Sequence, residues 1–250
     1  MKPQVDVIIQ PYTIRFSLYK DELVYHMASS SDMQLDDMER LFGIDPAATA
    51  LPNCNMGFLP VASVVLIRGE RNVIVDPGNH HIGFYGMLQD ALKMKDLTYE
   101  DIDKVVVTHW HHDHFSNITL FKGKELIIGE GELAFGESIY GKEEVRAKIA
   151  GFDAVTTVPA GEPLRVMAGV EAYLTPGHTP GSLSLIARAA DGKYAIVGDN
   201  AMTRTEWTER KFSHWYPPEQ AELIGRSLDR IAAEKPDRIV FGHDRMLSIT

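Results

Sequence analysis

Five runs of valine- and isoleucine-rich residues in this chain are each followed at once by a turn that carries an aspartate or a histidine. Such runs predict β-strands. Ligand sites in α/β sheets gather beyond the ends of strands, so polar side chains from five strands can converge on one place. The glycines in these turns let the backbone bend sharply and present the next side chain. The turn residues are Asp76, His109, His178, Asp199 and His243.

The strand-like runs alternate with stretches of helical periodicity, which predicts a mixed α/β domain. Residues 62–68 and 72–75 flank a Gly-Glu pair and predict a β-hairpin, whereas residues 85–94 and 219–233 predict helices. Further strands are expected at residues 104–107, 125–128, 170–174, 182–187, 194–197 and 238–241.

The first 60 residues have a different pattern, which predicts a strand at 5–9, a helix at 33–42 and a loop at 46–60. Their composition is not that of a flexible linker. We therefore expect a single domain over residues 1–250, with residues 1–60 as an N-terminal extension packed on it. This extension is expected to cover the pocket mouth or to join a partner subunit, so a homodimer stays open.

The charge balance excludes one class of partner. Lys and Arg number 25 against 35 Asp and Glu, a net charge of −10, and no long basic run occurs. An acidic chain of this kind is not expected to bind nucleic acid. The only cysteine is Cys54, so no intramolecular disulfide can form, and no apolar stretch is long enough to cross a membrane. These features predict a cytoplasmic protein with a small-molecule substrate.

Residues 109–114 read His-Trp-His-His-Asp-His and point to a metal site. In an extended segment, residues two apart project to the same side, so His109 and His111 can bind one ion together. If a helix begins near Asp113, that carboxylate and His114 face a second position beside the first. Buried imidazoles need partners, which ordinary packing rarely gives to so many. Neutral imidazole and carboxylate suit zinc, with iron and manganese as alternatives.

This segment, followed in order by Thr175-Pro176-Gly177-His178, Gly198-Asp199 and Gly242-His243, resembles the HxHxDH signature and later motifs of the metallo-β-lactamase-fold hydrolases. The resemblance covers about residues 60–245. It implies an αββα sandwich of two mixed β-sheets flanked by helices, with two divalent metal ions at one edge. It also implies that Asp76 supports the histidine segment from behind the ligands. The implied ligands are His109, His111 and His178 for the first ion, Asp113, His114 and His243 for the second, and Asp199 for both.

The resemblance also implies the chemistry. Two neighbouring cations supply a bridging hydroxide at neutral pH and polarise the bond that it attacks, which serves hydrolysis. Asp113 would orient the hydroxide or carry its proton, and Asp199 would hold both ions. Asp199 stands where the best-known β-lactamases have a cysteine ligand, and the chain has no basic run of the kind expected in RNA-processing members. Only seven residues follow His243, so the C-terminal domain of glyoxalase-II-type thioesterases is not expected. The compact lactonase-like group remains, with a small lactone or ester as substrate.

Several alternatives stay open. The same ligand set could serve a phosphodiesterase, a thioesterase or an iron-dependent redox enzyme. Acyl-homoserine lactonases usually place a tyrosine three residues after the bridging aspartate, where this chain has Met202. The aromatic residues Trp207, Trp215 and Tyr216 either line an acyl pocket or belong to the core. Histidines not expected to be ligands are His112, which should point away, and His26, His80, His81 and His214.

Overall fold

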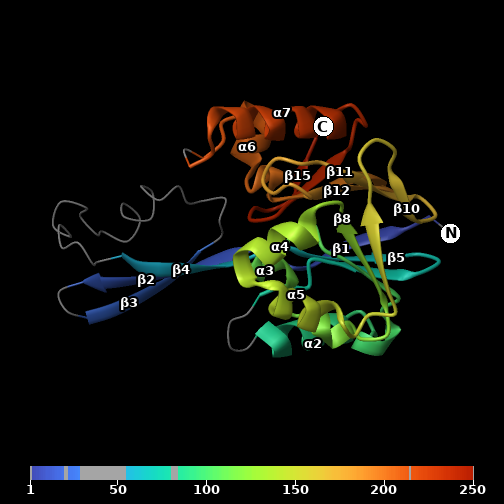
Figure 1. Cartoon of the computed structure of the whole chain (residues 1–250), viewed down its shortest axis with the longest axis horizontal. Coiled ribbons are helices and arrows are strands. Elements are labelled where there is room, and N and C mark those ends of the chain that lie inside the picture. The colour runs from blue at the N-terminus through green and yellow to red at the C-terminus, as the bar shows by residue number, and fades with distance from the viewer. Residues whose placement is uncertain (1, 20–21, 29–54, 80–83, 214, 250) are drawn as a thin grey trace.

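A computed structural model of the chain describes residues 2–19, 22–28, 55–79, 84–213 and 215–249. Side chains are described for these residues except 13–19, 22–28 and 55–59. Two six-stranded sheets stack face to face, and helices cover the outer face of each sheet (Figure 1). This arrangement is the αββα sandwich that the resemblance implied.

The first sheet has the strand order β1-β5-β6-β7-β8-β9. Its strands are β1 (Gln4–Ile9), β5 (Val64–Arg68), β6 (Asn72–Val75), β7 (Lys104–Val106), β8 (Glu125–Gly129) and β9 (Ala154–Val158). Strands β5 and β6 pair antiparallel with Val65 opposite Val75, which confirms the predicted hairpin. From β6 to β9 the pairing is parallel, so the carboxyl ends of these strands meet at one edge.

The second sheet has the order β10-β11-β12-β13-β14-β15 and is antiparallel except between β13 and β14. Its strands are β10 (Leu164–Met167), β11 (Val170–Leu174), β12 (Leu183–Ala189), β13 (Gly192–Gly198), β14 (Arg238–Phe241) and β15 (Leu247–Ser248). Each strand predicted between residues 170 and 241 is confirmed, and its ends differ from the predicted ones by two residues or fewer. Its valine and isoleucine content identified it locally.

Helices form the two outer layers. Those on the first sheet are α2 (Phe84–Lys93), α3 (His112–Phe115), α4 (Glu132–Tyr140) and α5 (Lys142–Ile149). Those on the second sheet are α6 (Arg204–Glu209) and α7 (Pro218–Ala232). Short 3-10 turns occur at Tyr99–Asp101, Ile118–Phe121 and Asp199–Ala201. Helices α2 and α7 confirm the predicted ones, and α7 has proline at its first position, where no backbone N–H is needed.

Alternation along the strands divides the apolar side chains between three cores. On β5, Leu66 faces the helical layer, whereas Val65 and Ile67 face the second sheet. A third core lies between the second sheet and α7, where Ile224 and Leu228 are fully buried. Strands with both faces buried read as continuous apolar runs, which is why composition alone identified them.

The N-terminal part contains β1 and a separate three-stranded sheet. Its strands are β2 (Tyr12–Tyr19), β3 (Glu22–Ala28) and β4 (Asn55–Val61), in the order β3-β2-β4. The predicted loop at 46–60 is wrong over residues 55–60, because β4 pairs with the distant β2, with Thr13 opposite Pro60. The helix predicted at 33–42 lies outside the described residues, and the packing of residues 1–60 on the domain stays a prediction. Within the described ranges, no helix has the length and apolarity to cross a membrane.

Two helical glycines offer a matched test of the packing. A Cβ atom at Gly136 of α4 would lie 2.3 Å from the buried indole of Trp110, whereas at Gly86 of α2 no described atom lies within 4 Å. We expect Gly136→Ala to lower the free energy of unfolding by about 1–3 kcal/mol through overpacking. Gly86→Ala should raise it by about 0.5–1 kcal/mol, because alanine loses less backbone entropy in a helix. Thermal unfolding followed by circular dichroism measures both, and shifts of the same sign would contradict the packing around Trp110.

Candidate metal centre

The histidine segment follows β7 as extended chain and then turns into α3. His111 is the last extended residue, with φ −105° and ψ 146°, and α3 begins at His112. The rings of His109 and His111 lie on the same side with centroids 4.7 Å apart. Trp110 points the other way and stacks on Phe115 in the core, with centroids 4.5 Å apart. The alternation of an extended chain therefore directs two imidazoles outward and anchors the residue between them.

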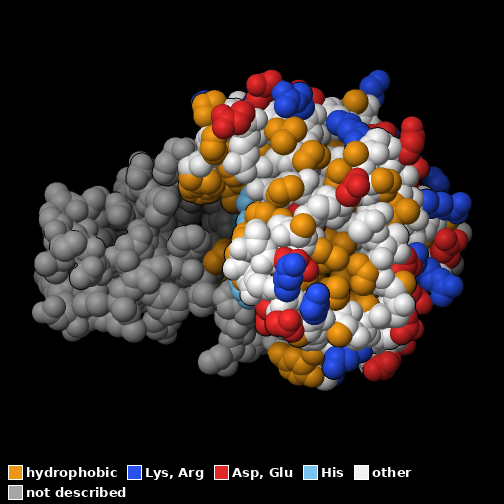
Figure 2. Space-filling view, viewed as in Figure 1, with side chains coloured by type: hydrophobic (Ala, Val, Ile, Leu, Met, Phe, Trp, Pro, Cys, Tyr) orange, Lys and Arg blue, Asp and Glu red, His pale blue; other side chains and the backbone are white. Residues whose placement is uncertain are grey.

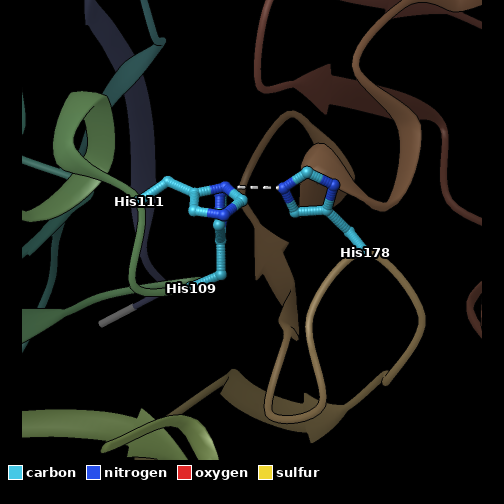
Figure 3. A group of neighbouring side chains, drawn as sticks. All are labelled: His109, His111 and His178. Atoms are coloured by element: carbon cyan, nitrogen blue, oxygen red, sulfur yellow. Dashed lines mark hydrogen bonds between the residues drawn. The ribbon is translucent and has the colours of Figure 1, made fainter. Parts of the chain in front are cut away.

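The loop between β11 and β12 brings His178 to the same place. Figure 3 shows its ring facing His109 and His111, and its Nε2 lies 2.9 Å from Nδ1 of His111. Gly177 before it has φ +153°, and its Cα packs against Ile224 of α7 so closely that a Cβ would lie 2.6 Å from that side chain. Burial lowers the pKa of His178 to about 3, which Asp199 only partly opposes. Burial likewise holds the pKa of His109 well below its usual value, so this group presents neutral imidazoles.

A second group lies beside the first and consists of Asp113, His114 and His243. His243 follows β14, and its Nε2 lies 3.1 Å from Oδ2 of Asp113. Burial alone would lower the pKa of His243, but the carboxylates of Asp199 and Asp113 raise this pKa to about 10. Burial would raise the pKa of Asp113, but His114 and His243 bring it to about 2. This group therefore attracts positive charge.

Asp199 lies between the two groups, directly after β13. Its Oδ2 is 3.2 Å from Nε2 of His243 and 3.7 Å from Nε2 of His178, and its Oδ1 is 3.3 Å from Nε2 of His114. Gly242 permits this position, because a Cβ there would lie 1.8 Å from Oδ1 of Asp199. One carboxylate therefore reaches imidazoles of both groups.

The donor atoms fit divalent cations. The candidate ligand atoms form three sets, and within each set all atoms lie within 4.8 Å of one another. The sets are His109, His111 and His178; His109, His114 and Asp199; and Asp113, His114 and His243. Among the described residues, Nε2 of His109, Nε2 of His114 and Oδ1 of Asp199 are buried without a hydrogen-bond partner. Buried polar atoms are nearly always paired, so several unpaired atoms converging on one place indicate a missing partner of positive charge. The structure thus brings all seven predicted residues together.

Asp76 holds the histidine segment from behind. Its Oδ1 accepts a hydrogen bond of 2.7 Å from the backbone N–H of Thr108, and its Oδ2 accepts one of 2.6 Å from the Thr108 hydroxyl. Oδ2 also lies 2.9 Å from Nδ1 of His114. Since a carboxylate only accepts, Nδ1 of His114 donates and its Nε2 is left free toward the site.

Two further polar residues reach the site that the sequence did not single out as partners of the histidines. The hydroxyl oxygen of Tyr216 lies 2.6 Å from Nδ1 of His178. Glu132 at the start of α4 accepts a hydrogen bond of 2.6 Å from the backbone N–H of Trp110. Neither belongs to a local motif, so only the fold reveals them. Of the other two aromatic candidates, Trp207 lies in the third core and Trp215 is 57% exposed.

His112 points away from both groups, as the alternation predicted. Its ring packs against Tyr140 of α4 with centroids 4.3 Å apart and against Phe115 at 5.0 Å. The side chains of His26, His80, His81 and His214 lie outside the described residues. Met202 contributes its backbone, since its carbonyl accepts a hydrogen bond from the N–H of His243 at 3.0 Å.

Comparison with known proteins agrees with this geometry. The chain is 27% identical over 185 residues to metallo-beta-lactamase domain-containing protein 1 of Xenopus laevis, covering 72% of this chain and 70% of that protein. It is 27% identical over 214 residues to an N-acyl homoserine lactonase of Bacillus thuringiensis, covering 74% of this chain and 82% of that protein.

Among solved structures, an N-acyl homoserine lactone hydrolase with the product N-hexanoyl-L-homoserine at its catalytic metal centre superposes with a TM-score of 0.62 at 20% identity. The superposition covers 98% of this chain and 94% of that chain, and at this identity it supports the fold alone. The family model of the metallo-beta-lactamase superfamily matches residues 56–243. The chain therefore belongs to the metallo-beta-lactamase superfamily.

Proposed function

We propose that this chain binds two divalent metal ions, zinc first among them, and hydrolyses a small lactone or ester. His109, His111 and His178 would hold the first ion, and Asp113, His114 and His243 the second. The observation that carries the proposal is the position of Asp199, whose carboxylate lies within 3.8 Å of imidazoles from both groups. A carboxylate placed in this way can bind two cations at once.

When bound, the ions would supply a hydroxide nucleophile at neutral pH and polarise the carbonyl group that it attacks. The protein's own residues hold protons at defined atoms. Asp76 holds the proton on Nδ1 of His114, so Nε2 is the nitrogen that would give up its proton and hold an ion. A proton on Nδ1 of His178 would be donated to the Tyr216 hydroxyl oxygen, which leaves Nε2 of His178 free in the same way.

Asp113 is suited to handle the proton of the attacking water. Its pKa of about 2 keeps it ionised at neutral pH, and it is 13% exposed at its side chain. An ionised carboxylate only accepts hydrogen bonds, so its oxygens can orient a water molecule and receive its proton.

The surroundings favour a small acyl substrate over a large anion. Phe135 of α4 lies beside His111, with ring centroids 5.7 Å apart. Tyr216 lies beside His178 at 6.0 Å and contacts the exposed Trp215. In the space-filling view, histidine side chains reach the surface next to hydrophobic side chains (Figure 2). These aromatic neighbours, together with the net charge of −10, suit a neutral lactone or ester. The lactonase among the relatives supports the same choice.

The metal content gives the first test of this proposal. Protein loaded with Zn²⁺ and freed of excess metal should hold about two ions per chain, because seven ligands exceed what one tetrahedral ion uses. Removal of the ions with a chelator should abolish hydrolysis and lower the unfolding temperature. Elemental analysis checks the number. At most one ion would contradict the two-ion proposal, and tightly held iron with visible absorption would favour a redox enzyme.

Asp199 and His112 form a contrasting pair of variants. Asp199→Ala should lose at least one ion and about 10²-fold or more in kcat/KM, because it removes the carboxylate between the groups. His112→Ala should keep both ions and stay within about 10-fold of the original activity, because its ring packs on Tyr140 outside the site. Metal analysis and kinetics on protein of intact circular dichroism provide the measurement. Equal losses in both variants would mean that the ligands are assigned to the wrong residues.

The substrate class is tested with a panel of neutral lactones, esters and thioesters. We expect turnover on a lactone or ester that exceeds the rate on N-acyl homoserine lactones, because Met202 replaces the usual tyrosine and one carbonyl donor can be worth about 10²–10³ in rate. His109→Ala is the control for contaminating hydrolases. Cleavage of bis(p-nitrophenyl) phosphate alone, lost in that variant, would identify a phosphodiesterase instead.

A further inference from the structure

Glu132 is a buried carboxylate that bridges two loops of the metal centre. It is fully buried at the first turn of α4. Its Oε1 accepts from the backbone N–H of Trp110 at 2.6 Å. Its Oε2 accepts from the hydroxyl of Thr179 and from the backbone N–H of Gly181, both at 2.8 Å. One side chain thus contacts a loop of the first sheet and a loop of the second.

The residues that it contacts stand next to the first group of histidines. Trp110 lies between His109 and His111 in the chain, and Thr179 follows His178. The two loops meet at the 2.9 Å approach of His111 and His178. Glu132 therefore joins the two backbone segments that carry these histidines.

Stability alone does not explain this carboxylate. Burial raises the pKa of Glu132, and within the described part of the chain the groups that oppose this are Trp110, Thr179 and Gly181, with no lysine, arginine or histidine among them. A buried carboxylate without a cation costs free energy, even when N–H and O–H groups satisfy its oxygens. Residues that are costly to bury and rigidly hydrogen-bonded are found where geometry matters.

We propose that Glu132 is a positioning residue that sets the distance between the His109–His111 loop and the His178 loop, and thereby the affinity of the first ion. The inference rests on the proposed binding of two ions and extends it. Glu132 touches neither an ion nor a substrate. Its effect on the second group, Asp113, His114 and His243, is correspondingly small.

Glu132→Gln is the most informative variant because it keeps the shape of the side chain. A glutamine amide has one acceptor oxygen and one NH₂ group, whereas the donors of Glu132 approach both oxygens. In either orientation the NH₂ group faces an N–H donor, of Trp110 or of Gly181. The Thr179 hydroxyl can turn to accept from the amide, but the backbone N–H of Trp110 or of Gly181 loses its acceptor without any change of volume.

The chain supplies a matched control within a second pair of residues. Thr179→Val removes the hydroxyl that donates to Glu132 and that also lies 2.6 Å from the Ser182 hydroxyl, and it should weaken the first ion in the same direction but less. The hydroxyl of Thr156 donates to Glu125 in the same way, at 2.7 Å, in strands β9 and β8. Thr156→Val should leave both ion affinities unchanged.

The experiment measures Zn²⁺ affinities of the full chain by competition with a chromophoric chelator, and Co²⁺ absorption as a signature of ligand geometry. Glu132→Gln should weaken one ion by about 10- to 100-fold and alter its Co²⁺ spectrum, while the other ion keeps its affinity. The ion is identified by double variants. In a His243→Ala background the same loss should recur, whereas in a His178→Ala background Glu132→Gln should change the remaining affinity by less than about twofold.

Each outcome bears on the inference. If Glu132→Gln lowers the unfolding temperature but keeps both affinities, the carboxylate is structural and the inference is wrong. The inference is also wrong if Glu132→Gln lowers ion affinity equally in the His243→Ala and His178→Ala backgrounds. It is wrong as well if Thr156→Val lowers ion affinity as much as Thr179→Val. A wild-type chain that binds no ion overturns the proposed function and this inference together. A chain that binds two ions but hydrolyses no panel substrate overturns only the proposed substrate class, because ion affinity is read without turnover.

Discussion

The carboxylate of Asp199 lies close to imidazoles carried by segments of both sheets. It follows β13 of the second sheet and lies 3.3 Å from His114, which belongs to a segment of the first sheet. Mutual attraction between a buried carboxylate and surrounding imidazoles is strong in a poorly solvated site. Both sheets must therefore be correctly stacked before this site can form, and the remaining loops are shaped around it.

Buried carboxylates outside the seven predicted ligands hold these loops. Asp76 fixes Thr108 and His114, Glu132 joins the loops of Trp110 and Thr179, and Glu206 accepts from the backbone N–H of Met202 at 2.6 Å. The carbonyl of Met202 in turn accepts from the N–H of His243. Each carboxylate takes hydrogen bonds from backbone that lies beside a candidate ligand. The positions of the candidate ligands therefore depend on residues that are not candidate ligands themselves.

Sequence reasoning found most strands of the two large sheets and the seven candidate ligands because both have local signals, whereas β2, β3, β9, β10 and β15 were not predicted. A buried strand is recognisable from its own composition, and His109 with His111 from the period of two. Glu132 and Tyr216 have no such signal, since their partners lie 22 to 49 residues away for Glu132 and 38 for Tyr216. Strand β4 was missed for the same reason, because it is defined by pairing with β2 across a long intervening segment.

Trp110 connects the helical layer to the candidate metal centre, which restricts the substitutions that positions 110 and 136 can accept. Its indole lies against Gly136, where even one added carbon would be too close, and its backbone is held between two candidate ligands. A bulkier residue on α4 is tolerated only together with a smaller ring at position 110. These two positions are therefore expected to covary among descendants of this chain, although neither side chain belongs to the candidate metal centre.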